Sequence, residues 1–546
     1  MNSFTITGKL VDLFSRDIYP ASVVVENGII AAIEKVAECA GQYLLPGFVD
    51  AHIHIESSML VPTAFAPLAV VHGTVATVSD PHEIANVCGA EGVQYMIDNS
   101  KQTPFKIFFG APSCVPATTF ETAGATLDAG AVEKLLASGD IWYLSEMMNY
   151  PGVLFNDEQV MAKIAAAHKA GKPVDGHAPG LRGEDARKYV AAGITTDHEC
   201  FTLEEALEKV ALGMHILIRE GSAARNYEAL HELLRLHPGR VMFCSDDKHP
   251  DELMVSHIDA IVRRSLAKGY DLYDVLRAAS VNPVMHYKLP VGLLRVGDPA
   301  DFIVADDLDD LRTLQTYISG QKVAEKGQAW IQPIAITPIN NFNTNHRIAA
   351  DFKLVTSNTE ANIRVIEALE GQLITNELIL PAKVEDGAIV SDTSRDIIKL
   401  VVVNRYMPDQ PVAIGFIRNT GLRSGALAST VAHDCHNIIA AGVSDGHICA
   451  AVNALIDSKG GVAVSSAEEG ISVLPLPVAG LMSAEDGYNV GAQYTAIDQK
   501  AKALGTTLHA PFMTLSFMAL LVIPSLKLSD RGLFSGAAFS FTPVVA

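Results

Sequence analysis

Short apolar runs alternate with amphipathic segments through the middle of the chain. The amphipathic segments, such as residues 157–171, 202–213 and 226–237, place apolar side chains three and four positions apart, which is typical of helices. The apolar runs have the length of buried strands and lie in residues 44–54, 73–80, 105–113, 141–149, 171–180, 193–200, 214–224 and 240–250. Eight such strands over roughly 240 residues predict an α/β fold, a (β/α)8 TIM barrel that we place at residues 46–287.

Strand-like alternation marks the two segments that flank this middle section. Residues 1–45 alternate apolar and polar side chains and turn at Asn27-Gly28, a strong hairpin signal. A similar pattern returns over residues 292–330. We therefore expect residues 1–45 and 288–335 to pair into one small composite β-sandwich subdomain.

A change of composition separates a third region from the rest. Residues 333–346 contain two prolines and four asparagines without periodicity, as in a linker. Strand-like and helix-like segments follow, and they predict a C-terminal α/β domain at residues 340–546. Its most apolar stretch, residues 511–528, is interrupted by Pro524 and is shorter than the about 20 residues of a membrane span, so we interpret it as buried core.

Composition narrows the classes of partner and compartment. The net charge of −21 argues against a nucleic acid or an anionic membrane as partner. Seven cysteines without a CxxC pair and an N-terminus without an apolar signal core are typical of a reduced, cytoplasmic protein. The apolar third region is compatible with a homodimer or a higher homo-oligomer.

Polar side chains gather where the expected barrel strands end, which is where barrel enzymes carry their chemistry. His52 and His54 point to one face because side chains in a strand alternate. Each candidate has an ordinary alternative: the HxH pair as a solvated strand end, His177 as a loop residue and His198 as a surface residue. The ordered set consists of His52, His54, Glu146, His177, His198, Asp246 and Asp247. Together these nitrogen and oxygen ligands predict a site for Zn²⁺, Fe²⁺ or Mn²⁺, in which a carboxylate can bridge two ions.

Several motifs resemble a known family. "PGFVDAHIHIESS", the later single histidines and the terminal "SDD" are similar to the amidohydrolase superfamily over residues 1–335. Many members with two metals bridge them with a carboxylated lysine, and this chain offers Glu146 instead. A narrower resemblance, to the bacterial adenine deaminase family, covers nearly the whole chain through "SDPHEIANVCG", "DGHAPGL", "TTDHEC", "CSDDKHPDEL", "VAHDCHNIIAAG" and "LSDRGLFSG".

The resemblance implies hydrolysis of adenine to hypoxanthine and ammonia, a reaction of purine salvage. Hydroxide held on two divalent ions would attack the base, and the ions would be Mn²⁺ or Fe²⁺, with Zn²⁺ also acceptable. The implied ligands are His52, His54 and Asp246 for one ion and His177 and His198 for the other, with Glu146 shared. Asp246 would also act as general base.

Other residues are candidates for proton transfer and substrate contacts. His82 and Glu83 are candidates for delivering protons, together with Asp247, although Asp80-Pro81 before them also fits the start of a helix. Arg219, Glu220 and Ser222 could bind the purine edge, with a strand-end salt bridge as the alternative for Arg219. His249 is expected to shape its loop rather than bind metal.

The segment "AHDCHN" contains His433, Asp434 and His436, which would themselves pass for a metal-binding cluster. We favour a helix start with capping polar groups; the competing interpretation is that this domain, or the copy of it in a partner subunit, closes over the barrel mouth.

Two other classes of function remain open at this point. One is another amidohydrolase, either a cyclic amidase of the hydantoinase or dihydroorotase kind or a sugar-amide deacetylase, and the other is a non-catalytic scaffold. The missing bridging lysine and the long extra domain count against the cyclic amidases, and the full ligand set counts against the scaffold.

Overall fold

Eight parallel strands form a closed barrel at the centre of the computed structural model, which describes residues 3–222, 224–332 and 334–546. The strands are β5 (Phe48–Ile53), β6 (Thr74–Ser79), β7 (Lys106–Ala111), β8 (Ile141–Met147), β9 (Val174–Gly176), β10 (Thr196–Asp197), β11 (His215–Arg219) and β12 (Val241–Cys244). They pair in order as β5 to β9 and β10 to β12. Parallel bridges from Val174 to Ile194 and from Ile53 to Asp246 join these two groups into a ring. Each strand lies in one of the eight apolar runs, so the predicted barrel is confirmed.

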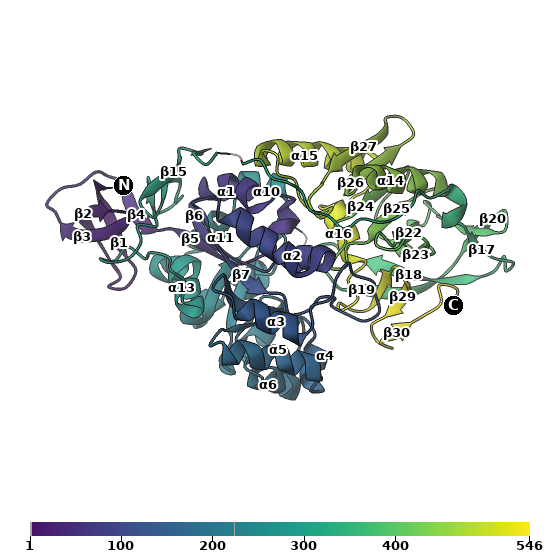
Figure 1. Ribbon diagram of the computed structural model, residues 1–546, viewed down its shortest axis with the longest axis horizontal. Helices are drawn as coiled ribbons and strands as arrows, with labels where there is room; N and C mark the ends of the chain where they lie inside the picture. Colours follow the sequence, from purple (N-terminus) through teal and green to yellow (C-terminus); the bar gives the residue numbers. More distant parts are fainter. Residues whose placement is uncertain (1–2, 223, 333) are drawn as a thin grey trace.

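Helices surround the strands on the outside of the barrel (Figure 1). They are α1 (Pro62–Val70), α2 (His82–Ser100), α3 (Ala129–Leu136), α4 (Tyr150–Leu154), α5 (Glu158–Lys169), α6 (Gly183–Ala191), α7 (Leu203–Ala211), α8 (Tyr227–Leu230), α9 (Leu233–Leu236), α10 (Pro250–Val255), α11 (Ile258–Ala267), α12 (Leu272–Leu276) and α13 (Asn282–Tyr287). Side-chain caps fix several of their starts: Asp128, Asp157 and Thr202 accept hydrogen bonds from the first turns of α3, α5 and α7.

One eight-stranded sheet combines the two flanking segments at the end of the molecule that lies far from the C-terminal region (Figure 1). Its strands are, in spatial order, β16 (Gln328–Ala329), β15 (Gln321–Glu325), β14 (Thr313–Ile318), β13 (Phe302–Ala305), β4 (Tyr43–Pro46), β1 (Phe4–Asp12), β2 (Asp17–Glu26) and β3 (Ile29–Lys35). The hairpin at Asn27-Gly28 is confirmed, with positive φ at both residues (53° and 81°), as a two-residue turn between twisted strands requires.

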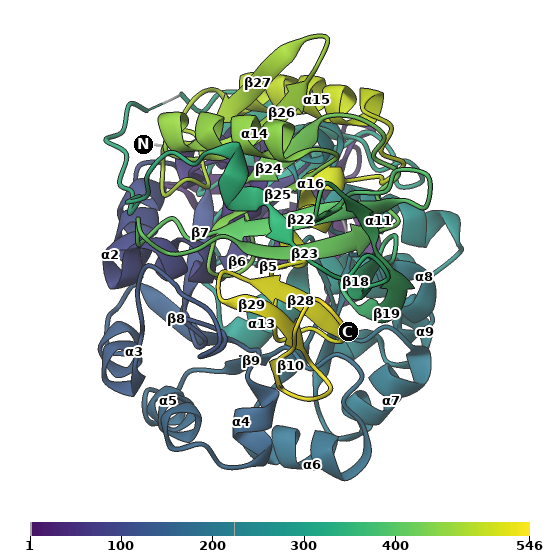
Figure 2. The same cartoon turned by 90° about the vertical axis from the view of Figure 1, so that its right-hand side faces the viewer.

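A second eight-stranded sheet organises the C-terminal region and faces the viewer in Figure 2. Its strands are, in spatial order, β19 (Thr375–Pro381), β18 (Asn362–Ala368), β23 (Ala413–Arg418), β22 (Ile397–Val403), β25 (Ile438–Gly442), β24 (Ala426–Ser429), β26 (Gly461–Ser466) and β27 (Gly470–Pro475). Two three-stranded sheets accompany it: β17 (Leu354–Val355), β21 (Ala388–Val390) and β20 (Lys383–Glu385), and β28 (Leu526–Ser529), β29 (Gly532–Ser535) and β30 (Ser540–Phe541). The helices are α14 (Asp445–Ser458), α15 (Gly487–Ala503) and α16 (Pro511–Phe517).

The apolar stretch at residues 511–528 is core, as predicted. Most of its side chains are buried, and α16 lies between the barrel and the C-terminal sheet (Figure 1). Across the described residues, none of the helices combines the length and apolarity that crossing a membrane needs.

Two barrel histidines provide a test of stability against pH. His215 and His286 pack with ring centroids 4.6 Å apart. Burial lowers the pKa of His215 to about 4, and burial together with the nearby His215 lowers that of His286 to about 3. Because the unfolded chain binds protons on them below pH 6.5 and the folded chain does not, the free energy of unfolding should fall as the pH drops from 6.5 to 5.

Replacing His286 with phenylalanine should flatten this decline by up to about 1.4 kcal/mol per pH unit, the contribution of one such group. Urea unfolding at several pH values measures the slope. The matched control is His346→Phe, at an exposed residue that pairs with Asp457. Equal slopes in the wild type and the His286 variant would contradict the assignment.

Candidate metal centre

The six predicted ligands come together at the carboxyl end of the barrel strands. They are His52 on β5, His54 directly after it, Glu146 on β8, His177 after β9, His198 after β10 and Asp246 after β12, and each is at most 5% exposed. The Nε2 atoms of His52 and His54 lie 3.2 Å apart, and His54 Nε2 lies 3.2 Å from Asp246 Oδ1. A solvated strand end is therefore excluded for the HxH pair.

Glu146 is the centre of this cluster. Its Oε1 lies 3.2 Å from His54 Nε2, while its Oε2 lies 2.7 Å from His177 Nδ1 and 3.2 Å from His198 Nε2. Burial alone would raise the pKa of Glu146, but the surrounding imidazoles hold it well below its ordinary value. An ionised carboxylate with one oxygen towards each of two imidazole groups has the geometry of a bridging ligand.

The imidazole nitrogens and carboxylate oxygens that converge here indicate that this cluster fits a cation. His54 Nδ1 lies 3.1 Å from the carbonyl oxygen of Asp80; donating there leaves the lone pair of Nε2 directed into the cluster. His52 Nδ1 and His177 Nε2 are buried without a hydrogen-bond partner among the described residues. Four imidazoles and two carboxylates form a donor set that suits Zn²⁺, Fe²⁺ or Mn²⁺.

Asp246 is held by a buried ion pair. Its Oδ2 accepts a hydrogen bond of 2.6 Å from Arg219, which also makes two contacts with Glu199. Burial opposes ionisation of Asp246, but Arg219, His52 and His54 lower its pKa well below the ordinary value. Arg219 thus forms the strand-end salt bridge of the alternative interpretation, and its guanidinium orients Asp246.

His82 and Glu83 open helix α2 beside the metal cluster. Pro81 is the N-cap of α2, so the helix starts one residue later than Asp80-Pro81 suggested. Asp80 accepts a hydrogen bond from the backbone of His82 at 3.1 Å and lies 3.0 Å from its Nδ1. His82 Nε2 lies 3.3 Å from Glu83, and its Nδ1 lies 3.5 Å from Glu146. This pair therefore borders the metal cluster.

The segment from His433 to His436 contradicts our preferred interpretation. It is not a helix start but a turn that connects β24 to β25. His433 and His436 both contact the carboxylate of Glu83 in the barrel. The competing interpretation was the better one, because the C-terminal region reaches the barrel mouth here.

Asp247 and His249 follow Asp246 in the chain, and both contact Ser57. Asp247 accepts a hydrogen bond from Ser57 and lies 4.0 Å from His433 Nε2. Burial lowers the pKa of His249 to about 4, and its Nδ1 lies 3.2 Å from the carbonyl oxygen of Ser57, so it is not in the metal cluster. A crevice too small to hold a water molecule lies beside His249; Met59, His249, Ser429, Val431, His433, Phe512, Met513 and Ser516 line it.

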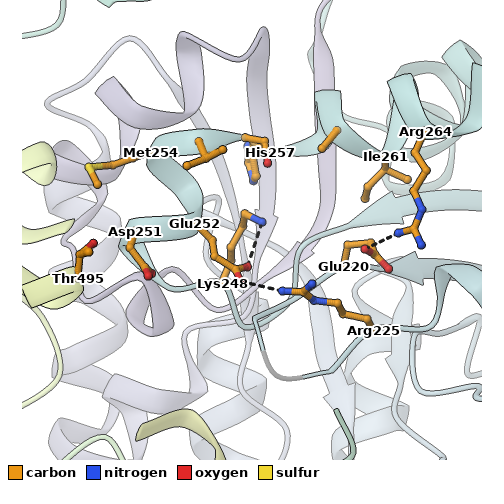
Figure 3. A pocket seen from close by; sticks show the side chains of 13 residues that line it. Glu220, Arg225, Lys248, Asp251, Glu252, Met254, His257, Ile261, Arg264 and Thr495 are labelled. Atoms are coloured by element: carbon orange, nitrogen blue, oxygen red, sulfur yellow. Dashed lines mark hydrogen bonds and ion pairs between the residues drawn. The ribbon is translucent and has the colours of Figure 1, made fainter. Parts of the chain in front are cut away.

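Glu220 is not brought to the metal cluster. Figure 3 shows it in a separate cavity with its carboxylate directed at Arg264, the two groups 2.8 Å apart. Ser222 also points away, to the carboxylate of Glu252 at 3.1 Å. Glu220 and Ser222 therefore find their hydrogen-bond partners outside the metal cluster.

Two carboxylates of the site are missing from the sequence-based set. Asp80 joins His54, His82 and Glu146 within 4.8 Å, and Glu199 joins His177 and His198 in the same way. Asp80 in "SDPH" directly follows the end of β6, and Glu199 in "DHEC" lies two residues after the end of β10. A carboxylate at the carboxyl end of a barrel strand is the signal that could have identified them.

Comparisons with known proteins agree with this geometry. Residues 43–323 match the model of the amidohydrolase family, and residues 372–540 match that of the adenine deaminase C-terminal domain. A relative named adenine deaminase from Salinibacter ruber is 55% identical over 540 residues, covering 99% of this chain and 98% of the relative. Relatives of the same name from Sulfurovum sp. and Methanosarcina mazei are 56% and 53% identical and cover 97% and 99% of this chain, and 98% and 99% of their own lengths.

Proposed function

The chain belongs to the adenine deaminase family of amidohydrolases, and on this premise we propose how its residues hydrolyse adenine to hypoxanthine and ammonia. The enzyme is a hydrolase that acts on a C–N bond, and the family binds divalent metal. The observation that carries the assignment of the site is the position of Glu146 between His54 on one side and His177 and His198 on the other.

This arrangement supports two ions. His52, His54 and Asp246 would hold one, His177 and His198 the other, and Glu146 would bind both. Mn²⁺ or Fe²⁺ suits this mixture of ligands, and Zn²⁺ is also acceptable. When bound, such ions supply a Lewis acid and lower the pKa of water from 15.7 towards about 7.

The protein's own groups would move the protons. Asp246 accepts a proton from the attacking water while the water oxygen bonds to C6 of adenine, and His82, paired with Glu83, donates a proton to ring nitrogen N1. Asp246 then passes its proton to the amino group, the C6–N bond breaks, and ammonia leaves with the bonding electrons. The proton on the new oxygen returns to the His82–Glu83 pair, which leaves the carbonyl of hypoxanthine.

Substrate contacts would come from the side of Asp247. Its carboxylate accepts a hydrogen bond from Ser57 and lies 4.0 Å from His433 Nε2. Arg219 would act through Asp246 rather than on the purine, and Glu220 has no place in this proposal.

Compartment and assembly are further parts of the proposal. All seven cysteines are free thiols, as in a reducing compartment, which supports a cytoplasmic location. We propose a homodimer or a higher homo-oligomer, and size-exclusion chromatography with light scattering tests it.

A substrate panel tests the function. The enzyme is stripped with a chelator, reconstituted with Mn²⁺, Fe²⁺ or Zn²⁺, and assayed for ammonia release from free bases, nucleosides and cyclic amides. We expect metal-dependent release of ammonia from adenine. His54→Ala should abolish this release, because His54 contacts both Glu146 and Asp246. Turnover of a hydantoin or a dihydropyrimidine in place of adenine would refute the substrate, and silence on every substrate would favour the scaffold.

A further inference from the structure

We propose that His433 and His436 of the C-terminal region are positioning residues that hold the carboxylate of Glu83 in the active site. This inference rests on the function proposed above and deepens it. His433 Nδ1 lies 2.5 Å from Glu83 Oε1, and His436 Nε2 contacts Glu83 Oε2. All three side chains are at most 2% exposed. The two carboxylate oxygens are thus each held by a different imidazole from a distant part of the chain.

The hydrogen bond at Nδ1 of His436 fixes the tautomer of this imidazole. The backbone N–H of Ala432 donates to His436 Nδ1 at 3.2 Å. An imidazole nitrogen that accepts carries no hydrogen, so the hydrogen of the neutral ring is on Nε2. His436 therefore donates to Glu83, and a hydrogen bond to a carboxylate is stronger than one between neutral groups.

The turn that carries these histidines is fixed from several directions. The backbone N–H of His436 donates to Ala432 at 2.7 Å, and His436 has a φ of 53°, a left-handed conformation that is uncommon for residues other than glycine. The ring of His433 stacks on Phe517 of α16 at 4.5 Å. Asn437 donates to the carbonyl oxygen of Thr122 on the barrel at 2.9 Å. Unusual backbone held by many contacts is typical of functional sites.

Glu83 needs these partners to keep its place. A buried carboxylate without hydrogen bonds is costly, so on losing a donor it turns or takes up a proton. Either change would disturb the 3.3 Å contact with His82 through which the proposed proton transfer runs. His436 has no contact with the six ligands in this structure, which makes it the residue to test.

The first experiment measures adenine deamination by His436→Ala and His436→Gln in the metal-loaded full chain. We expect kcat to fall about 100-fold in His436→Ala, the lower end for loss of an acid–base group, with KM changed less than about threefold. Glutamine can place a donor where Nε2 lies, so it should recover at least about tenfold. His447→Ala is the matched control, because His447 lies in the same region and contacts Ser465.

A double-mutant cycle with Glu83→Gln decides how His436 acts. If it works through Glu83, adding His436→Ala to Glu83→Gln should cost less than about threefold, because effects that act through one group are not additive. Full additivity would overturn the proposal. A third metal equivalent that is present in the wild type and lost in His436→Ala would also overturn it, since Glu83, His433 and His436 would then form a third metal site.

An infrared measurement keeps the test independent of turnover. The carboxylate band that disappears in Glu83→Gln should shift in His436→Ala and return towards its wild-type position in His436→Gln. An unshifted band would refute the contact even in a folded protein. Wild-type enzyme that leaves adenine unchanged would instead refute the proposed function, and the band would still report on the position of Glu83.

Discussion

Replacing Glu146 with glutamine should abolish adenine deamination and reduce the bound metal below two equivalents. Glu146 contacts His54, His177 and His198 through its two oxygens, and an amide offers one neutral oxygen in place of two charged ones. We expect kcat to fall by at least about 10⁴-fold, because both the metal ligands and the groups they orient are disturbed together. Metal analysis and steady-state kinetics on the same preparation measure the effect.

The control for this variant is Glu121→Gln. Glu121 is equally buried and bonds Thr118, and burial together with Asp434 raises its pKa to about 8, so it is already protonated at neutral pH. Its amide variant should keep its metal and its activity within about threefold, as expected for a substitution of similar shape. A Glu146→Gln enzyme with two metal equivalents and more than a tenth of the wild-type rate would exclude the bridging role.

Asp246→Asn is expected to separate metal binding from proton transfer. The amide keeps an oxygen towards His52 and His54 and loses the basic carboxylate, so much of the metal should remain. We expect kcat to fall about 10³-fold or more, the range for loss of a general base. The hydrogen bond from Arg219 to Oδ2 is also disturbed, since an amide nitrogen placed there would face the guanidinium.

A buried aspartate away from the cluster provides the comparison. Asp259 on α11 accepts a hydrogen bond from the backbone of His257 at 2.7 Å and pairs with Arg263. Asp259→Asn should retain kcat within about threefold, whatever it does to stability. If Asp246→Asn loses metal in proportion to its activity, the loss of metal accounts for the whole effect and the assignment of Asp246 as general base is wrong.

Local pattern was enough to predict the barrel. Each strand is a short apolar run that ends in a polar residue, and the carboxyl ends of parallel strands meet at one rim. For this reason His52, Glu146 and Asp246 could be expected to meet although they are far apart in sequence. Glu220 also follows an apolar strand, but its side chain pairs with Arg264 on helix α11 and not with the metal cluster. Only the packed position of α11 decides between these two directions.

The contribution of the C-terminal region could not be predicted in this way. His433 and Glu83 are 350 residues apart, and they meet because two separately formed sheets pack together. "AHDCHN" has the polar residues of a helix start, and nothing in its own pattern shows that its partner Glu83 lies on helix α2 of the barrel. Asp80 and Glu199 were missed for a related reason, because a carboxylate beside a ligand histidine reads equally well as a cap or a solvated side chain.

The closure of the barrel has a consequence for how the enzyme matures. Strands β5 and β12 meet where the ring closes: the N–H of Asp246 donates to the carbonyl oxygen of His52 at 2.9 Å, and that of His54 to Asp246 at 3.3 Å. An ion held by these three side chains, as proposed above, would cross-link the first barrel strand to the last. A nascent chain could then complete this half of the site only after the last strand had emerged, and metal uptake would report that the ring has closed. We therefore expect amide exchange at the β5–β12 seam to slow when metal binds.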